Sequence, residues 1–133
     1  MRYLLDTNIC IYIAKRRPAK VVSRLEQLQP GDVGMSVVTF LELTYGACKS
    51  QRVVENLARL EQLERVVPAQ PLDAQVARDY GRIRADLEQK GALIGAYDLL
   101  IAAHALSLGL TLVTNNVREF RRVPGLKVEN WAD

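Results

Sequence analysis

The chain has 133 residues, of which 49% are hydrophobic and 25% charged, with a net charge of +3 and a pI near 9.0. This length predicts one domain over residues 1–133 with an ordinary buried core, and the mild basic charge is compatible with a phosphate-bearing partner without indicating one. No apolar run approaches the ~18 residues of a membrane span, and Asp6 interrupts the short apolar stretch at the N-terminus, which excludes a targeting signal. We therefore expect a cytoplasmic protein without membrane association.

The two cysteines, Cys10 and Cys48, are far apart in the sequence and have apolar or small neighbours. This usage is typical of reduced, buried thiols and argues against a disulfide framework or a zinc site. The chain also has a single histidine. Carboxylates are therefore the main side chains that it offers for catalysis.

Apolar periodicity in the first half of the chain predicts two short strands and the helices that follow them. Pro18 suits the first turn of a helix, and Ser36 suits an N-cap. The expected elements are a strand over 2–5, a helix over 8–15, a helix from Pro18 to Pro30-Gly31, a strand over 33–35, and a helix capped by Ser36 and ending near residue 47.

The second half repeats this alternation of helices and short strands. The expected elements are a helix capped by Ser50 and ending near residue 65, a strand at 66–67, a helix capped by Asp73 and ending at Gly91, a helix over 97–108 ending at Gly109, and strands over 110–113 and 127–129. Short apolar strands that alternate with helices predict a three-layer α/β/α sandwich around a parallel sheet of about five strands.

Three carboxylates, Asp6, Glu42 and Asp98, stand near the expected ends of these elements. Open parallel sheets bind ligands beyond the carboxyl ends of their strands, where Asp6 and the segment 114–116 are both expected. The three acids are therefore candidates to meet at one edge of the sheet. Converging carboxylate oxygens would suit a hard divalent cation.

Each acid also has a purely structural interpretation. Asp6 could cap a helix or form an Asx turn, and Asp98 could complement the positive end of its helix dipole. For Glu42 two interpretations stay open, because Thr39 to Glu42 matches a capping box, whereas a cap at Ser36 would place Glu42 almost two turns into the helix. His104, six residues beyond Asp98, lies about 120° from the face of that acid, which favours a partly buried structural role.

Four segments together resemble the PIN-domain ribonucleases, specifically the VapC toxins of bacterial and archaeal toxin–antitoxin pairs. The resemblance covers essentially the whole chain. Its segments are LLDTN at 4–8, SVVTFLEL at 36–43, IGAYDLLIAAHA at 94–105 and LVTNNVREF at 112–120.

The resemblance implies a role for individual residues. Asp6, Glu42 and Asp98 match acids that ligate Mg²⁺ or Mn²⁺ around a scissile RNA phosphate, and Asp6 and Asp98 are the first choices as direct ligands. At the position of the family's fourth acid this chain has Asn116, and Glu119 is the candidate to supply the missing carboxylate. Whether the site holds one metal ion or two therefore remains open. The orienting residues expected around these ligands are Thr7, Asn8 and Thr114, and the expected RNA phosphate contacts are Arg118 and Arg121.

The implied protein is a metal-dependent endoribonuclease toxin that a small VapB-like antitoxin neutralises by occupying a groove near the site. Among such toxins the chain resembles the enterobacterial-type group that cleaves initiator tRNA in its anticodon stem-loop, and the family commonly forms homodimers. Two alternatives remain. Asn116 leaves open a non-catalytic PIN-like module that binds RNA or protein, and an acidic pocket would also suit a phosphoryl-transfer or receiver domain, although Asp6 lacks the nearby second aspartate of haloacid-dehalogenase-like phosphatases.

Overall fold

The computed structural model describes residues 1–133 and contains a five-stranded sheet in which all neighbouring strands are parallel. The strands are β1 (Tyr3–Leu5), β2 (Val33–Ser36), β3 (Ala69–Gln70), β4 (Thr111–Val113) and β5 (Val128–Glu129), in the order β3-β2-β1-β4-β5. β1 is central, since Tyr3 pairs with Val33 on one side and with Thr111 on the other. The predicted parallel α/β sheet is confirmed.

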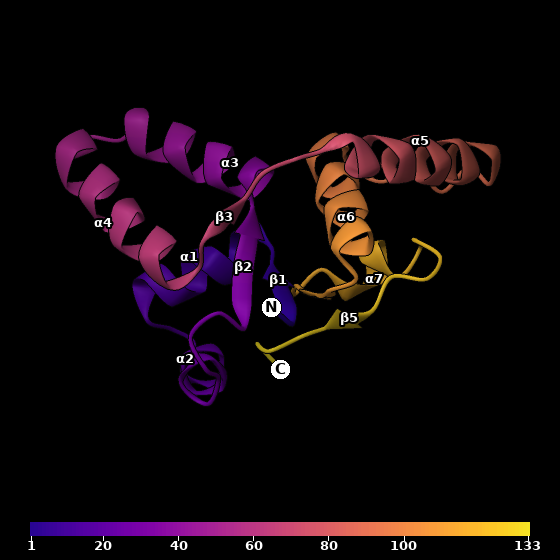
Figure 1. Ribbon diagram of the computed structural model, residues 1–133. Coiled ribbons are helices and arrows are strands. Elements are labelled where there is room, and N and C mark those ends of the chain that lie inside the picture. Colours follow the sequence, from indigo (N-terminus) through magenta and orange to yellow (C-terminus); the bar gives the residue numbers. More distant parts are fainter.

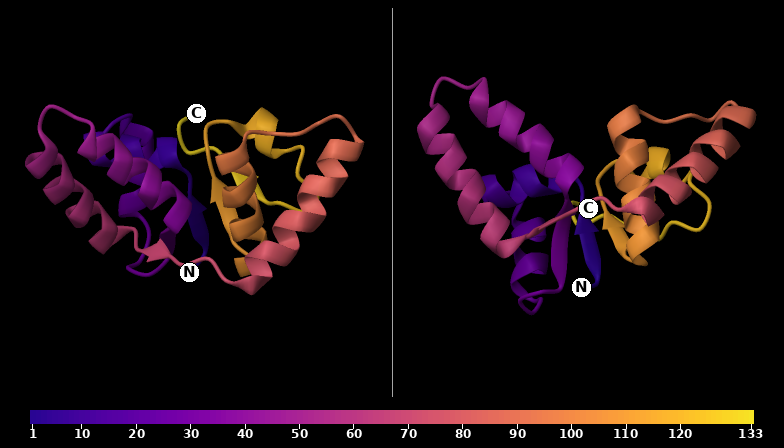
Figure 2. Two further views of the ribbon diagram at one scale, coloured as in Figure 1. Left: turned by 90° about the horizontal axis from the view of Figure 1, so that it is seen from above. Right: turned by 45° about the horizontal axis from the view of Figure 1, so that its top comes forward.

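Helices cover both faces of this sheet (Figure 1). They are α1 (Thr7–Lys15), α2 (Ala19–Glu26), α3 (Val37–Cys48), α4 (Val53–Val66), α5 (Ala74–Gln89), α6 (Ala96–Leu108) and α7 (Val117–Phe120). The pairs α3–α4 and α5–α6 lie on opposite sides, and the segment with β3 crosses between them (Figure 2). None of the helices is long and apolar enough to cross a bilayer.

The alternation of side chains along β1 accounts for the two hydrophobic cores. Leu4 packs with residues of α5 and α6, whereas Tyr3 and Leu5 pack with residues of α1, α2 and α4. Successive strand residues point to opposite faces, so three consecutive apolar residues are buried only when both faces are covered. All three are at most 6% exposed, which agrees with the three-layer prediction.

The strand expected at 66–67 is wrong. Val66 is the last residue of α4, and the Val67 amide still donates to the Leu63 carbonyl at 2.8 Å. Pro68 lacks an N–H and ends the helical pattern, but its carbonyl accepts from Met35 at 3.0 Å. Pairing with β2 therefore begins at Pro68, and the strand follows it.

The cap expected at Ser50 is also wrong. α4 begins at Val53 with Arg52 as its N-cap, and the Arg52 side chain makes no capping hydrogen bond. The Ser50 hydroxyl instead donates to the Ala47 carbonyl at 2.7 Å and accepts from Asn56 at 2.9 Å. Ser50 therefore closes the end of α3.

The two cysteines differ in exposure. Cys10 is buried as expected, but Cys48 is exposed, which corrects the prediction of a buried thiol. Cys48 is the last residue of α3, where only part of the helix surface meets the core.

The strand order places a topological switch beside β1. The chain builds β2 and β3 on one side of β1 and then crosses to β4 and β5 on the other. Ligands of such sheets bind beyond the carboxyl ends of the strands at this switch. Here Asp6 follows β1, and the segment 114–116 follows β4.

Candidate functional site

Asp6 lies at the switch point and combines a structural role with a place in the site. Its backbone amide donates to the Val113 carbonyl at 3.0 Å, which joins it to the end of β4. Its Oδ1 accepts from the Ile9 amide at 3.0 Å, which caps α1. The carboxylate, which also accepts from Thr114, lines the adjacent cleft.

Glu42 enters the same cleft from α3. Ser36 is the N-cap, since its hydroxyl oxygen accepts from the Val38 amide at 3.1 Å. Glu42 is therefore almost two turns into the helix, and of its two interpretations the capping box is excluded. Its Oε1 accepts a hydrogen bond of 2.9 Å from the Thr7 hydroxyl. The first turn of α1 thus fixes the orientation of the Glu42 carboxylate.

Asp98 reaches the cleft from the first turn of α6, whose N-cap Gly95 provides no side-chain cap. Burial, and after it the nearby charges of Glu119, Asp6 and Glu42, together raise the pKa of Asp98 to about 6. The helix dipole would favour an ionised acid here, so its effect does not dominate. The three predicted acids are close enough to repel one another.

The acid cleft, as we call this hollow, has a volume of about 180 Å³ and is lined by Asp6, Thr7, Asn8, Glu42, Asp98, Asn116 and Phe120. No lysine or arginine lines it. Burial also raises the pKa of Asp6. Hydrogen bonds from Thr114 and Ile9 lower this pKa, whereas the charge of Glu42 raises it, and the net shift is upward. The acid cleft thus gathers negative charge that no basic side chain offsets.

This donor set fits a hard divalent cation. No group of three acidic, histidine or cysteine side chains is placed so that it could hold a metal ion by itself. Mg²⁺ does not need one, because it usually binds one or two carboxylates and retains several waters. The carboxylates and amides that line the acid cleft are oxygen donors of the required kind.

Asn116 and Glu119, which mark the expected fourth acidic position, are hydrogen-bonded to each other. The Asn116 side-chain amide donates to Glu119 Oε2 at 2.5 Å, and the Gly95 backbone amide donates to Glu119 Oε1 at 3.1 Å. Burial alone would raise the pKa of Glu119, but these bonds, the Asp98 carboxyl and the Arg122 charge lower it. Glu119 therefore joins α7 to the loop before α6, and it is absent from the lining of the acid cleft.

A second hollow of about 410 Å³ adjoins the acid cleft and shares Asn116 with it. Of the two arginines predicted to contact RNA, Arg118 lines this hollow. Arg121 does not, and its neighbour Arg122 does. The basic side chains thus lie beside the acids and not among them.

Several residues of the site were not identified from the sequence. Asn115 links Asn8 to the Tyr12 hydroxyl through hydrogen bonds of 3.4 and 2.9 Å. Phe120, the last residue of α7, also lines the acid cleft. The spacing of Asn8 and Tyr12, four residues apart on one helix face, was the signal in the sequence that could have linked these two residues.

Thr114 and His104 lie behind the lining. Thr114 is fully buried, and its hydroxyl oxygen accepts from the Asn116 backbone amide at 2.9 Å. His104 is also fully buried, with Nδ1 at 2.7 Å from the Ser36 hydroxyl, and burial lowers its pKa. The structure agrees with the prediction of a structural histidine.

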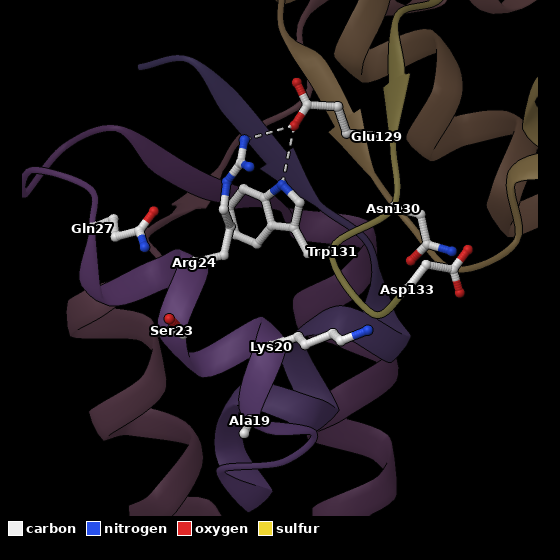
Figure 3. Close-up of a pocket in the computed structure, with 9 residues that line it drawn as sticks. All are labelled: Ala19, Lys20, Ser23, Arg24, Gln27, Glu129, Asn130, Trp131 and Asp133. Atoms are coloured by element: carbon white, nitrogen blue, oxygen red, sulfur yellow. Dashed lines mark hydrogen bonds and ion pairs between the residues drawn. The ribbon is translucent and has the colours of Figure 1, made fainter.

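A larger cavity, of about 590 Å³, lies elsewhere, between α2 and the C-terminal segment (Figure 3). There Glu129 accepts from Arg24 at 3.1 Å and from the Trp131 indole at 3.2 Å. Arg24 also lies over the Trp131 ring, 5.5 Å from its centroid. Its lining has two basic side chains, Lys20 and Arg24, and two acidic ones, Glu129 and Asp133, so this cavity lacks the unbalanced charge of the acid cleft.

Comparison with known proteins identifies similar chains over the full length. The PIN domain family matches residues 3–126. The chain is 46% identical to the tRNA(fMet)-specific endonuclease VapC of Shigella flexneri and 45% identical to ribonuclease VapC2 of Haemophilus influenzae, with 99% of each chain covered. VapBC-1 from nontypeable Haemophilus influenzae superposes with a TM-score of 0.93 at 40% identity over 100% of both chains. DNA-bound VapBC from Salmonella typhimurium gives 0.93 at 42% identity over 98% of both.

Proposed function

Because the chain belongs to the VapC family of PIN-domain ribonucleases, the toxins of VapBC toxin–antitoxin systems, we propose that it hydrolyses RNA phosphodiester bonds in the acid cleft. The observation that carries this proposal is the meeting of Asp6, Glu42 and Asp98, from three separate elements, in one hollow without a basic residue. Repulsion among them contributes to the raised pKa of Asp98, and a cation would relieve it.

Dependence on a divalent metal is general among PIN-domain ribonucleases, and for this chain we propose Mg²⁺, with Mn²⁺ as a substitute. Asp6 and Asp98 would hold the ion directly. Glu42, fixed by Thr7, would bind it directly or through water, or orient the attacking water. When bound, the cation would polarise the scissile phosphate and offset the charge that develops on its oxygens.

The remaining residues would orient this machinery. Thr114 donates to Asp6 and accepts from the Asn116 backbone amide, so its hydroxyl links two residues of the acid cleft. Asn8 would be held toward the substrate by Asn115. Asn116, with its amide bound to Glu119, would take the place of the fourth acid. Such supporting hydrogen bonds typically contribute 10- to 100-fold to metal affinity or activity.

RNA would enter over the second hollow, where Arg118 and Arg122 can neutralise phosphates next to the scissile one. Arg121 is exposed and would contact phosphates further along the chain. The acids repel a polyanion, so cations at the rim are needed to hold it beside them. This placement supports RNA as the substrate.

We propose initiator tRNA, cut in its anticodon stem-loop in the cytoplasm, as that substrate. The Shigella relative named a tRNA(fMet)-specific endonuclease, 46% identical over the full chain, supports this choice. The test is incubation of the purified protein with initiator tRNA and with elongator methionine tRNA. We expect cleavage of the initiator alone, with Mg²⁺ present and not with EDTA. Binding that survives EDTA without any cleavage would instead favour a non-catalytic PIN-like module.

We also propose that a VapB-like antitoxin binds the groove between α1, α3 and α4. This groove has a volume of about 490 Å³ and is mainly apolar, with Ile11, Leu43, Leu60 and Leu63 in its lining. It shares Thr7 and Glu42 with the acid cleft, so a segment bound there could extend to the catalytic acids. The VapBC complexes among the similar structures support such a partner. A homodimer, common in the family, is proposed as well.

Gly46→Trp is expected to abolish neutralisation while RNA cleavage remains. Gly46 lines the groove, and a Cβ at this position meets no atom within 4 Å, so a large side chain would fill the groove and not the core. The measurement is growth of cells that co-express the toxin and the product of the neighbouring antitoxin gene. Gly81→Trp is the matched control, since Gly81 lies on α5 with the same free space. Neutralisation of Gly46→Trp equal to that of the control would contradict the proposed groove.

A further inference from the structure

We propose that the buried hydrogen bond between Ser36 and His104 sets the separation of Glu42 and Asp98, which makes His104 a positioning residue for the ribonuclease reaction. The inference rests on the acid cleft proposed above as the metal site. It follows from one contact between the two helices that carry these acids: Ser36 begins α3, and His104 lies in α6.

The contact is closely defined by its surroundings. Ser36 Oγ already accepts from the Val38 amide at 3.1 Å, so its single proton is available to His104 Nδ1 at 2.7 Å. Both side chains are 0% exposed. Water therefore cannot replace either partner, and loss of the ring would leave a buried hydroxyl without an acceptor.

The other ring nitrogen does not compete for this position. His104 Nε2 has no partner at hydrogen-bonding distance and angle. The Pro71 carbonyl interacts with the ring only weakly and raises its pKa in part. The bond to Ser36 is thus the one full hydrogen bond that orients the imidazole. With Ser36 as donor, the ring carries its proton on Nε2, on the side of Pro71.

Because the contact lies at a distance from both acids, a small change of angle at the contact changes the distance between them. Glu42 is six residues after Ser36, and Asp98 is six residues before His104. At 1.5 Å per residue each acid lies about 9 Å along its helix from the contact. A 10° change in the angle between the helices would therefore move one acid about 1.5 Å relative to the other.

A displacement of this size would matter for catalysis. Misplacement by about 1 Å can cost about 100-fold in rate even when the mutation is remote from the chemistry. Catalytic groups need to be held within about 0.5 Å of their productive positions. A buried hydrogen bond of fixed length between the N-cap of α3 and the second half of α6 supplies such a constraint, which apolar packing between α3 and α6 alone would not.

The test compares three substitutions in the full-length protein, with Mn²⁺ as the probe of the metal site. His104→Leu fills a similar volume without polar atoms, whereas His104→Asn keeps a polar atom near the position of Nδ1. Ile83→Val is the control, because Ile83 is buried on α5 in the same core and its aliphatic side chain takes no part in the hydrogen bond. Mn²⁺ affinity is measured by calorimetry, and kcat and KM with RNA below the melting temperature of each variant.

We expect His104→Leu to weaken Mn²⁺ binding at least 10-fold and to lower kcat 10- to 100-fold, with KM for RNA changed less than 3-fold. His104→Asn should recover most of both losses. Ile83→Val should lower the melting temperature and leave Mn²⁺ affinity and kcat unchanged. A loss of stability without these changes is what a merely structural histidine would produce.

The possible failures are distinguishable. If the wild-type protein binds no Mn²⁺, the proposed metal site is wrong and this inference with it. If wild type binds Mn²⁺ and His104→Leu binds it equally well, only this inference is overturned. Should His104→Leu fail to fold, Ser36→Ala removes the same hydrogen bond without added bulk and must reproduce the loss of Mn²⁺ affinity; wild-type affinity in that variant would also overturn the inference.

Discussion

Asp6→Asn is expected to abolish RNA cleavage and toxicity while the protein remains folded. An amide keeps the N-cap of α1, because Asn accepts from the Ile9 amide as well as Asp does. It removes the charge that a divalent cation requires. Loss of a supporting group already costs 10- to 100-fold, so loss of a direct ligand should lower kcat by more than about 100-fold. Cleavage of initiator tRNA in Mg²⁺, together with growth after induction, measures both effects.

The same substitution should not destabilise the metal-free protein. The pKa of Asp6 is raised in the folded state, chiefly by burial, so its ionised form opposes folding near neutral pH. Asp6→Asn should therefore unfold at the same temperature as wild type in EDTA, or higher. Asp73→Asn is the matched control: Asp73 caps α5 through bonds to Gln75 and Val76 and lies outside the acid cleft. Full cleavage by Asp6→Asn, or equal loss in both variants, would contradict the proposed role.

The fold was largely predictable because hydrophobic periodicity indicates most of its helices and strands. The two cores alternate along β1, and apolar stripes mark the long helices, so strand–helix alternation and the parallel sheet followed from sequence. β3 was misplaced because a strand of two residues has no periodicity to read. Val66-Val67 is the more apolar pair, but the hydrogen bonds of α4 extend through it, and Pro68 sets where pairing with β2 begins.

The acids of the site were predictable for a different reason, namely that strand ends in parallel sheets fix where functional residues lie. Sequence could not decide between the two interpretations of Glu42, since both Ser36 and Thr39 are able to cap a helix. The structure decides in favour of Ser36, and Thr7 then reaches Glu42 across 35 residues of sequence.

The surroundings of the acids could not be predicted, because they depend on how distant segments meet. Glu119 contacts Gly95 across 24 residues, and Asn115 contacts Tyr12 across 103. The choice between Arg121 and Arg122 depends on the orientation of the four-residue helix α7, where a shift of one residue turns a side chain by about 100°. Neither spacing nor composition specifies such a rotation.

Asp98→Asn is expected to flatten the pH dependence of stability in the metal-free protein and to remove its stabilisation by Mn²⁺. The pKa of Asp98 rises from 3.8 to about 6 on folding, chiefly through burial and then through Glu119, Asp6 and Glu42. Between these values the folded protein binds more protons than the unfolded chain, so wild-type stability should fall as pH rises through this interval.

A bound cation should reverse this trend, because it favours the ionised carboxylate and offsets the repulsion among the acids. Urea unfolding at intervals between pH 4 and pH 7, with EDTA or with Mn²⁺, measures both effects. Asp86→Asn is the control, since Asp86 lies in a surface ion pair with Lys90 at 3.0 Å, remote from the acid cleft. Wild-type stability that rises through this interval in EDTA, or equal stabilisation of Asp98→Asn and wild type by Mn²⁺, would show that the charge of Asp98 is not what the cation binds.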